Sequence, residues 1–342
     1  MSSSVCVMGL WHLGCVTAAC LSKNHPIIGF DPDKKVIENL QHGTPPIMEP
    51  GLAELIAAST KANNLSFSAD LASSARASDI LYITFDTPVD ADDKVDLGPI
   101  ERTIDSLLPF LEDRHLLVLS SQIPVGTSRR LLGKIRAAGK KCGLCYSPEN
   151  LRLGTALDVF MHPERVVLGI SDDVLKPRLE ELFSGVGGER LYMDLESAEM
   201  TKHAMNAYLA TLISFSGEIS DLCEQSGANA ISVMNALRKE KRVSPHAPIM
   251  PGLGFGGGTL ARDVQILRAL GKQKSTPTPM LDSTFQSNRE RMHYVPRKLK
   301  EVLGSLSGKT IAFFGLTYKP GTDTLRRSLA LDVIDELKAS GA

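Results

Sequence analysis

A glycine turn near the start of the sequence has the residue types that bind a dinucleotide. The segment after the first apolar run reads Gly9, Leu10, Trp11, His12, Leu13 and Gly14. In a strand-turn-helix unit, the first glycine makes the turn, the second lets a pyrophosphate approach the backbone, and the third packs the helix against the strand. The first and third glycines are present, while Trp11 takes the place of the second. The pattern indicates a pyrophosphate-binding turn that contains a bulky replacement.

Two polar residues after the second apolar run fit the ribose of the same cofactor. Asp31 ends that run, where a carboxylate would accept hydrogen bonds from the ribose hydroxyls of NAD and repel the extra phosphate of NADP. Lys35 follows as a neighbour of the ribose. The alternative is that the glycines only build a tight turn and that Asp31 caps the next helix. The pattern favours NAD as the cofactor.

The cysteine spacing does not predict a metal site, and the charge distribution does not predict a partner that is recognised by net charge. Cys142 and Cys145 form a C-x-x-C, but no second pair follows that would complete a zinc site. The 38 basic and 39 acidic residues are mixed along the chain, which argues against nucleic acid as a partner. The sequence contains no export signal and no apolar run of membrane-spanning length, so we expect a cytoplasmic protein with reduced thiols and no membrane partner.

The elements that position these residues change in character along the chain. In the first half, short apolar runs alternate with amphipathic stretches, which is the βαβ pattern of a doubly wound parallel sheet. The strand candidates are residues 4–8, 26–31, 79–86, 115–121 and 142–147. We therefore predict an α/β fold in which residues 1–195 form a Rossmann-like NAD-binding domain.

The remaining sequence predicts helices followed by a return to strand. A long run from Ser197 has the apolar spacing of a helix and contains no proline, and helical material continues to about Gly304. Residues 196–306 are predicted to form a helical central domain. Residues 310–321 read as a strand and a glycine turn, so that residues 307–342 would begin a second Rossmann-like domain. Such a domain needs about 100 residues, and we expect the chain to end within it.

Seven segments together resemble the UDP-glucose/GDP-mannose dehydrogenase family, in order and at similar spacing across nearly the whole chain. They are residues 43–52, 87–88, 123–127, 147–152, 198–210, 251–257 and 315–323. The resemblance implies oxidation of the primary alcohol at C6 of a nucleotide-linked hexose to a carboxylate, with two NAD molecules used in succession. It also implies a nucleotide-sugar substrate and a homodimer built on the central helices, for which burial within one chain is an adequate alternative.

The resemblance also implies roles for individual residues. Lys202 and Asn206 fall on positions that stabilise the developing oxyanion, and their i,i+4 spacing would put both on one helix face. Asp263 matches the carboxylate that orients a catalytic water, and Glu149 matches the glutamate that activates water in thioester hydrolysis. Taken singly, Lys202 also fits a solvated lysine on an amphipathic helix, and Asn206 also fits a buried structural amide. The resemblance adds cofactor residues Thr87 and Gln122, and substrate residues Leu151, Arg152, Phe255, Gly256, Gly257 and Lys319.

The catalytic cysteine of the family is replaced in this chain by Thr259. A threonine hydroxyl is far less acidic than a thiol and is a poor nucleophile without an adjacent base, so a covalent second oxidation would be impaired. Gln122, Leu153 and Arg262 also stand where the family has a threonine, a glutamate and a lysine. The replacements fall in the predicted cofactor-binding and catalytic sites, which indicates that the function has changed.

Three hypotheses follow from these replacements. The leading one is an NAD-dependent oxidation of a nucleotide sugar that stops at the aldehyde, for which Lys202, Asn206 and Asp263 would suffice. The alternative is a catalytically silent or regulatory homologue that binds a nucleotide sugar, which Trp11 in the turn favours. In the third, an activated water hydrates the aldehyde, and the four-electron oxidation survives without a cysteine. The nucleotide and the hexose stay open.

Overall fold

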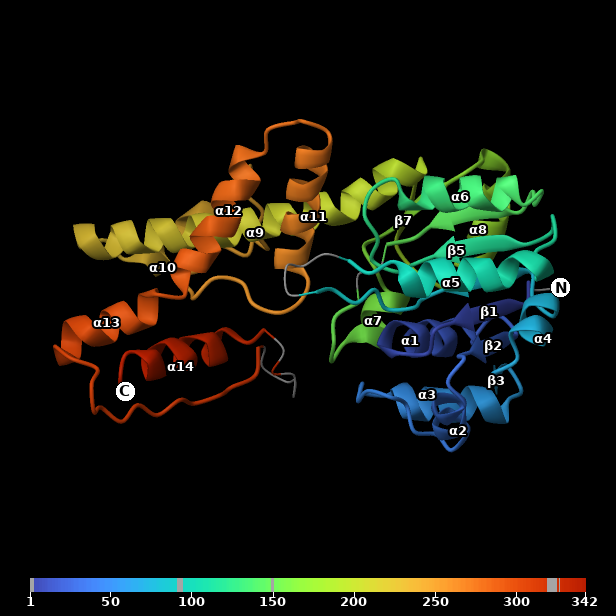
Figure 1. Ribbon diagram of the computed structural model, residues 1–342, viewed down its shortest axis with the longest axis horizontal. Coiled ribbons are helices and arrows are strands. Elements are labelled where there is room, and N and C mark those ends of the chain that lie inside the picture. The colour runs from blue at the N-terminus through green and yellow to red at the C-terminus, as the bar shows by residue number, and fades with distance from the viewer. Residues whose placement is uncertain (1–2, 91–94, 149–150, 319–324, 326) are drawn as a thin grey trace. The chain divides into compact units, whose positions relative to one another are not determined.

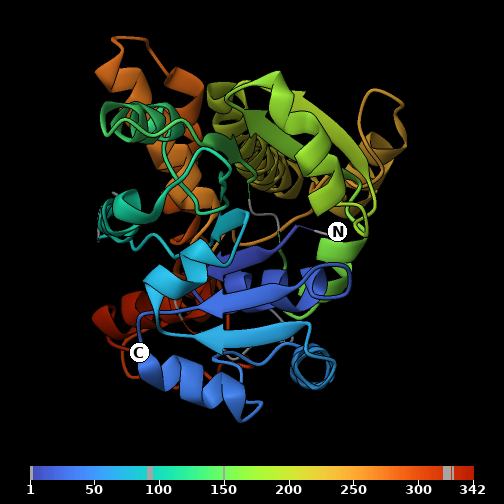
Figure 2. The same ribbon diagram turned by 90° about the vertical axis from the view of Figure 1, so that its right-hand side faces the viewer.

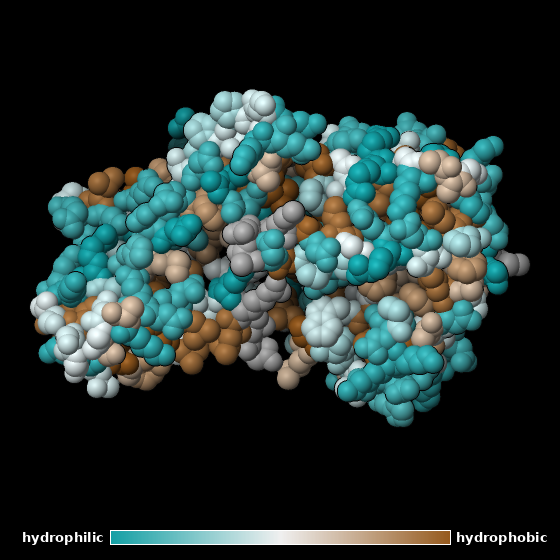
Figure 3. All heavy atoms as spheres, in the orientation of Figure 1, coloured by the Kyte–Doolittle hydropathy of each residue, from teal (hydrophilic) through white to brown (hydrophobic). Residues whose placement is uncertain are grey.

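The computed structural model describes residues 3–342 apart from 91–94, 149–150, 319–324 and 326. Glu149 and Lys319, two of the predicted site residues, lie outside the described residues. The chain divides into two compact units, Met1–Thr201 and Lys202–Ala342. The face of each unit that Figure 3 shows is mostly hydrophilic, with apolar side chains in scattered patches.

An eight-stranded sheet forms the centre of the first unit (Figure 1). Across the sheet the order is β3-β2-β1-β4-β5-β6-β7-β8, and all neighbours are parallel except β6 and β7. The order reverses between β1 and β4, which is where doubly wound folds bind ligands at the carboxyl ends of their strands. The strands are β1 (Val5–Met8), β2 (Ile27–Phe30), β3 (Leu65–Ser68), β4 (Ile80–Ile83), β5 (Leu116–Leu119), β6 (Gly143–Tyr146), β7 (Arg165–Ile170) and β8 (Glu189–Met193).

Helices cover both faces of this sheet (Figure 1, Figure 2). One face packs against α4 (Leu71–Arg76), α5 (Gly98–Leu107) and α6 (Thr127–Ala137). The other packs against α1 (His12–Leu21), α2 (Lys34–Gln41), α3 (Leu52–Lys61), α7 (Ala156–Met161) and α8 (Lys176–Leu182). Because the central strands are buried on both faces, they are apolar at nearly every position. The predicted α/β fold and its five predicted strands are therefore confirmed.

Three strands escaped prediction. β3 and β8 lack a continuous apolar run, whereas residues 166–170 of β7 are an apolar run that is not among the predicted strands. β3 and β8 are the two edge strands, and each has a half-exposed face that accepts polar residues such as Ser66 and Arg190. β7 begins with the charged Arg165 and follows a short helix closely. Strand pairing rather than local composition places these three segments in the sheet.

Helices make up the second unit. They are the larger part of α9 (Leu195–Ser226), α10 (Ala230–Lys239), α11 (Leu260–Gln273), α12 (Pro279–Arg291), α13 (Tyr294–Leu303) and α14 (Leu329–Ala339). Small apolar clusters join them, for example Ala210 of α9 with Val264 of α11. The division of the chain into three domains stays a prediction. In the described parts of both units, no helix combines the length and the apolar character required to cross a membrane.

The strand predicted after Lys309 is not formed. Residues 310–314 make no strand ladder with any described segment, although they are apolar from Ile311 to Phe314. Ile311 and Phe313 instead pack against Val333 and Leu337 of α14. A strand requires a neighbouring strand that supplies N–H and C=O partners. Because no described segment pairs with residues 310–314, their apolar composition alone does not make them a strand.

Candidate functional site

The glycine turn joins β1 to α1 at the carboxyl end of the central strand. Gly9 has φ of 101°, a left-handed conformation, and a Cβ there would lie 2.8 Å from the backbone nitrogen of Phe85. A Cβ on Gly14 would lie 1.9 Å from the Gly9 carbonyl oxygen, so α1 approaches the turn more closely than a side chain permits. Trp11 is 50% exposed, so much of its ring faces solvent. The turn therefore keeps the backbone geometry that suits a pyrophosphate.

Asp31 lies directly beyond β2 and contacts this turn. Its Oδ2 accepts a hydrogen bond of 2.8 Å from the Leu10 N–H, and its Oδ1 accepts one of 3.0 Å from the Asp33 N–H. The cap of α2 is Asp33, which accepts from the N–H of the exposed Lys35, so the alternative in which Asp31 is the cap does not hold. A carboxylate oxygen has a second lone pair, so Asp31 retains acceptor capacity for a ribose hydroxyl. These residues fit NAD.

Two further predicted cofactor residues meet beyond the ends of β4 and β5. The Thr87 hydroxyl donates a hydrogen bond of 2.7 Å to the Gln122 carbonyl oxygen, and both residues are buried. The structure thus brings the turn, Asp31, Thr87 and Gln122 to the carboxyl ends of adjacent parallel strands. This arrangement is the expected place for a dinucleotide in such a sheet.

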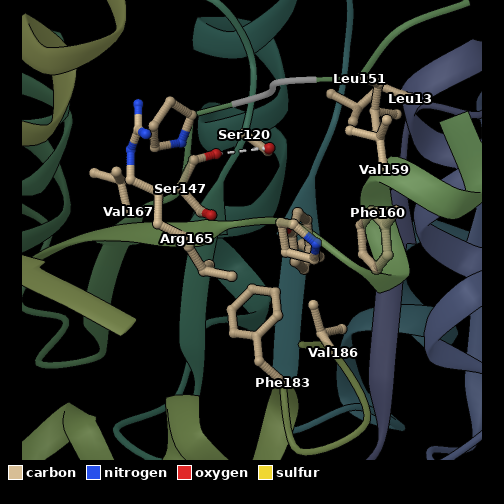
Figure 4. A pocket seen from close by; sticks show the side chains of 14 residues that line it. Leu13, Ser120, Ser147, Leu151, Val159, Phe160, Arg165, Val167, Phe183 and Val186 are labelled. Carbon is tan, nitrogen blue, oxygen red and sulfur yellow. Dashed lines mark hydrogen bonds between the residues drawn. The ribbon is translucent and has the colours of Figure 1, made fainter. Parts of the chain in front are cut away.

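A small cavity of about 80 Å³ lies in the first unit beside the predicted substrate residue Leu151 (Figure 4). Its lining is mainly apolar and includes Leu13 of the glycine turn as well as Leu151. At its polar side, the Ser120 hydroxyl donates to the Ser147 carbonyl oxygen at 2.7 Å. Leu151 is partly buried, while the neighbouring Arg152 is exposed. The cavity thus touches both a predicted cofactor segment and a predicted substrate segment.

A polar cluster lies in the second unit between α9 and α11. It consists of Lys202, His203 and Asn206 on α9 and Asp263 on α11, and all four residues are buried. The Asp263 Oδ1 is 2.9 Å from the His203 Nδ1, and the Asn206 amide donates to Asp263 Oδ2. The structure thus unites three of the predicted catalytic residues.

Sequence reasoning missed His203. Its neighbours Lys202 and Asn206 are marked by their family positions, whereas His203 becomes notable only because it stands three residues before Asn206 and shares its helix face.

The surroundings of Asp263 keep its carboxylate ionised. Burial by itself would raise the pKa of Asp263, because desolvation penalises the charged form. The hydrogen bond and charge of His203, the Asn206 amide and the charge of Lys202 outweigh burial and hold this pKa below its ordinary value. A buried, ionised acceptor therefore fixes the orientation of the polar side chains that contact it.

Thr259 is the residue that precedes α11, and it lies one helical turn before Asp263. Its carbonyl oxygen accepts from the Asp263 N–H at 3.1 Å, and its side chain makes no capping hydrogen bond. The residue is exposed. The hydroxyl therefore stands at the helix start without the buried environment that surrounds Asp263.

The glycine loop before Thr259 is held by α12. The Asn288 side chain accepts from the Phe255 N–H at 2.8 Å and donates to the Phe255 carbonyl oxygen at 3.1 Å. Arg291 donates to the Gly252 carbonyl oxygen at 2.9 Å. On the other side, the Gly257 N–H donates to the Arg327 carbonyl oxygen at 2.9 Å. Asn288 was not predicted, because nothing in the sequence relates it to a loop 33 residues earlier.

The C-x-x-C pair is part of the apolar core. Cys142 belongs to the cluster on one face of the sheet and Cys145 to the cluster on the other, so the two thiols point apart. Both are free and buried. Among the described residues, no three His, Cys, Asp or Glu side chains are grouped to hold a metal ion.

Comparisons with known proteins agree with this geometry. Residues 3–186 match the NAD binding domain of the UDP-glucose/GDP-mannose dehydrogenase family, and residues 196–290 match the central domain of the same family. The two matches together cover well over half of the chain.

Individual relatives are similar along almost the entire chain. The UDP-glucose 6-dehydrogenase TuaD of Bacillus subtilis is 32% identical over 342 residues, which cover 99% of this chain and 74% of that protein. A UDP-glucose 6-dehydrogenase of Pseudomonas aeruginosa is 31% identical over 98% of this chain and 77% of its own length. The structure of a UDP-glucose dehydrogenase from Pyrobaculum islandicum superposes with a TM-score of 0.93 at 30% identity, covering 100% of this chain and 81% of that one.

Proposed function

Because this chain belongs to the UDP-glucose/GDP-mannose dehydrogenase family and its cofactor is NAD, we propose that it oxidises a primary alcohol of a nucleotide-linked hexose and stops at the aldehyde. The observation that carries this proposal is the buried cluster of Lys202, Asn206 and Asp263 beside a threonine in the position of the family's cysteine. UDP-glucose is the first substrate to test, since relatives are named for it.

The cluster supplies the electrostatics of the first oxidation. Lys202 and Asn206 stabilise the negative charge that develops on the alcohol oxygen as its proton passes to water oriented by Asp263. Asp263 accepts an N–H of Asn206 and so fixes the orientation of that amide. NAD, held at the glycine turn and Asp31, would supply the acceptor for the hydride of the alcohol carbon. One alcohol and one NAD thus give one aldehyde, one NADH and one proton.

Thr259 limits the reaction to this stage. A second oxidation through a thioester needs a nucleophile that adds to the aldehyde and later leaves, and a neutral hydroxyl performs both tasks poorly. Thr259 is exposed and lies at the start of α11, with no titratable base among its hydrogen-bond partners in the described structure. Glu149, by its family position, acts only after a thioester has formed and is not required for the first step.

Counting the NADH formed per product tests this proposal. The full chain is supplied with NAD and UDP-glucose, or GDP-mannose, and the product is identified after trapping with an aldehyde reagent. We expect one NADH per trapped aldehyde. Thr259→Cys should raise the yield towards two NADH with a carboxylate product, whereas the matched control Thr259→Ser should not. Two NADH per carboxylate from the unmodified chain would overturn the two-electron limit.

A catalytically silent homologue is the second candidate, because Trp11 occupies the pyrophosphate turn. Calorimetric titration with NAD distinguishes the two. Binding at micromolar to low millimolar concentrations is expected of a dehydrogenase, while no heat of binding at millimolar NAD would favour the silent homologue.

We also propose a homodimer that forms through α9. Tyr208, Phe215 and Leu222 are 64%, 46% and 64% exposed and lie about two helical turns apart. They therefore form an apolar stripe along one side of the helix, which we call the α9 stripe. An exposed apolar stripe of this length is typical of an association surface, and a second copy of the chain would bury it against its own.

A further inference from the structure

Glu49 is a buried carboxylate that the proposed reaction does not use. It is 5% exposed and accepts three hydrogen bonds. Its Oε2 is 2.9 Å from the His12 Nε2 and 2.9 Å from the Gly154 N–H, and its Oε1 is 2.8 Å from the Ala156 N–H. Burial of a charge is costly unless partners replace the lost water, and here three do.

The three partners belong to the two segments that are predicted to bind the two ligands. His12 lies in the glycine turn and is the first residue of α1. Gly154 and Ala156 lie two and four residues after Arg152, which with Leu151 is predicted to bind the substrate. These segments are more than 100 residues apart in the sequence. One carboxylate therefore joins a predicted cofactor segment to a predicted substrate segment.

Apolar contacts also join the glycine turn to the segment that contains Leu151. Leu13, the neighbour of His12, and Leu151 line the same cavity of about 80 Å³ (Figure 4). α1 also packs against both α3 and α7, the helices that begin just after Glu49 and Gly154. The two segments thus form one packed group within the first unit.

The Glu49 carboxylate is ionised, so it can accept hydrogen bonds from all three of its partners. Burial alone would raise its pKa, but the Ala156 and Gly154 N–H groups and then His12 outweigh burial and hold the pKa below its ordinary value. An ionised carboxylate only accepts, whereas a glutamine in its place would offer one oxygen and an amino group that cannot accept. Glu49→Gln therefore removes part of the connection with almost no change in shape.

We propose that Glu49 is a positioning residue that couples the binding of NAD at the glycine turn to the binding of a nucleotide sugar at residues 151–152. This rests on the proposed function. When one ligand binds, it restricts the motion of its own segment, and the contacts of Glu49 restrict the other segment as well. Binding of the second ligand then costs less conformational entropy of the protein. The coupling is reciprocal, so each ligand strengthens the binding of the other by the same factor.

Calorimetry on the full chain tests this coupling. The Kd of NAD is measured without and with saturating UDP-glucose, or GDP-mannose if that is the one the chain binds. In the unmodified chain we expect the sugar nucleotide to tighten NAD binding by about fivefold or more, within the usual range of coupling between sites. Glu49→Gln should reduce this factor to nearly one. The exposed Glu54→Gln on α3 is the matched control and should keep it.

His12→Phe provides a second variant that keeps both backbone bonds to Glu49, in case Glu49→Gln does not fold. It too should lose most of the coupling factor. A lower melting temperature with an unchanged coupling factor in these variants would show a purely structural ion pair and overturn the inference. Binding of both ligands to the unmodified chain without coupling would overturn it as well. Failure of that chain to bind either ligand would instead overturn the proposed function.

Discussion

At the scale of single residues, Asp263 organises the buried polar cluster that we propose to be catalytic. It contacts His203 and Asn206 directly and carries a negative charge that faces Lys202. The side chains that we propose to contact substrate therefore depend on the carboxylate that they face. If Lys202 and Asn206 are oxyanion donors, as we propose, these contacts hold them in place before the substrate binds. Electrostatic catalysis depends on such preorganised donors.

Removal of the Asn206 amide should impair the chemical step. We expect Asn206→Ala to lower kcat by about 10²-fold, the usual loss for one oxyanion donor. The Kd of NAD should change little, because the predicted cofactor residues lie in other segments. Steady-state kinetics and an NAD titration check both statements, and an unchanged kcat would remove Asn206 from the proposed mechanism.

Asp263→Asn should destabilise the protein in a way that depends on pH. The pKa of Asp263 in the folded state is depressed, so its ionised form stabilises the fold above the unfolded-state pKa of about 3.9. The loss should be about 1–3 kcal/mol at pH 7, because buried donors lose their acceptor. As the pH falls through the folded-state pKa, the difference between the two proteins should vanish.

Urea unfolding over a series of pH values measures this difference. If the gap between the two proteins narrows already above about pH 5, the pKa of Asp263 is not depressed in the folded state.

At the scale of elements, the glycine loop owes its shape to α12 rather than to its own residues. Gly254 has φ of 97°, and a Cβ there would lie 2.4 Å from the Asn288 side-chain oxygen that accepts from Phe255. The conformation and the clamp therefore both exclude a side chain at this position. A loop held in this way can present its backbone to a sugar without ordering on binding.

Gly254→Ala should consequently weaken both the fold and substrate binding. We expect the free energy of unfolding to fall by about 1–3 kcal/mol, because the backbone is left-handed and the Asn288 clamp must shift. The KM for the nucleotide sugar should rise more than the KM for NAD. Gly258→Ala is the control, since a Cβ there meets no atom within 4 Å. Equal melting temperatures for the two variants would contradict this account.

The sequence carried enough information for the sheet but not for the contacts that complete the site. Buried parallel strands must be apolar on both faces, so β1, β2, β4, β5 and β6 are visible as apolar runs. The glycine turn and the position of Asp31 at the end of β2 could also be predicted, because both are local patterns of spacing. The pairs His203–Asp263, Glu49–Gly154 and Phe255–Asn288 could not, since each joins distant segments by tertiary packing alone.

At the scale of the whole molecule, the α9 stripe is an apolar surface that a single chain leaves exposed. Apolar residues scattered singly on a surface need no explanation, but three that repeat along one helix do. The long helix contributes Lys202 and Asn206 as well, so the same element would carry both the association surface and part of the site. Dimer formation and catalysis would then share one rigid support.

A charge in the middle of the α9 stripe should dissociate the dimer. We expect Phe215→Glu to give a monomer, because association would bury an unpaired carboxylate. Light scattering on a size-exclusion column measures the mass. Val174→Glu places the same charge on another exposed apolar residue and should leave the mass unchanged. An unmodified chain that is already monomeric at micromolar concentration would disprove the dimer.

The burial of all six cysteines has a practical consequence for labelling chemistry. Thiol reagents attack the exposed thiolate, and burial raises the pKa of Cys6, Cys15, Cys20, Cys142 and Cys145. The native protein should therefore react slowly with an alkylating dye. Thr259→Cys would introduce an accessible thiol at an exposed position against this unreactive background. A fluorophore attached there would report ligand occupancy directly, and protection of that thiol by a candidate sugar nucleotide would rank substrates without any turnover.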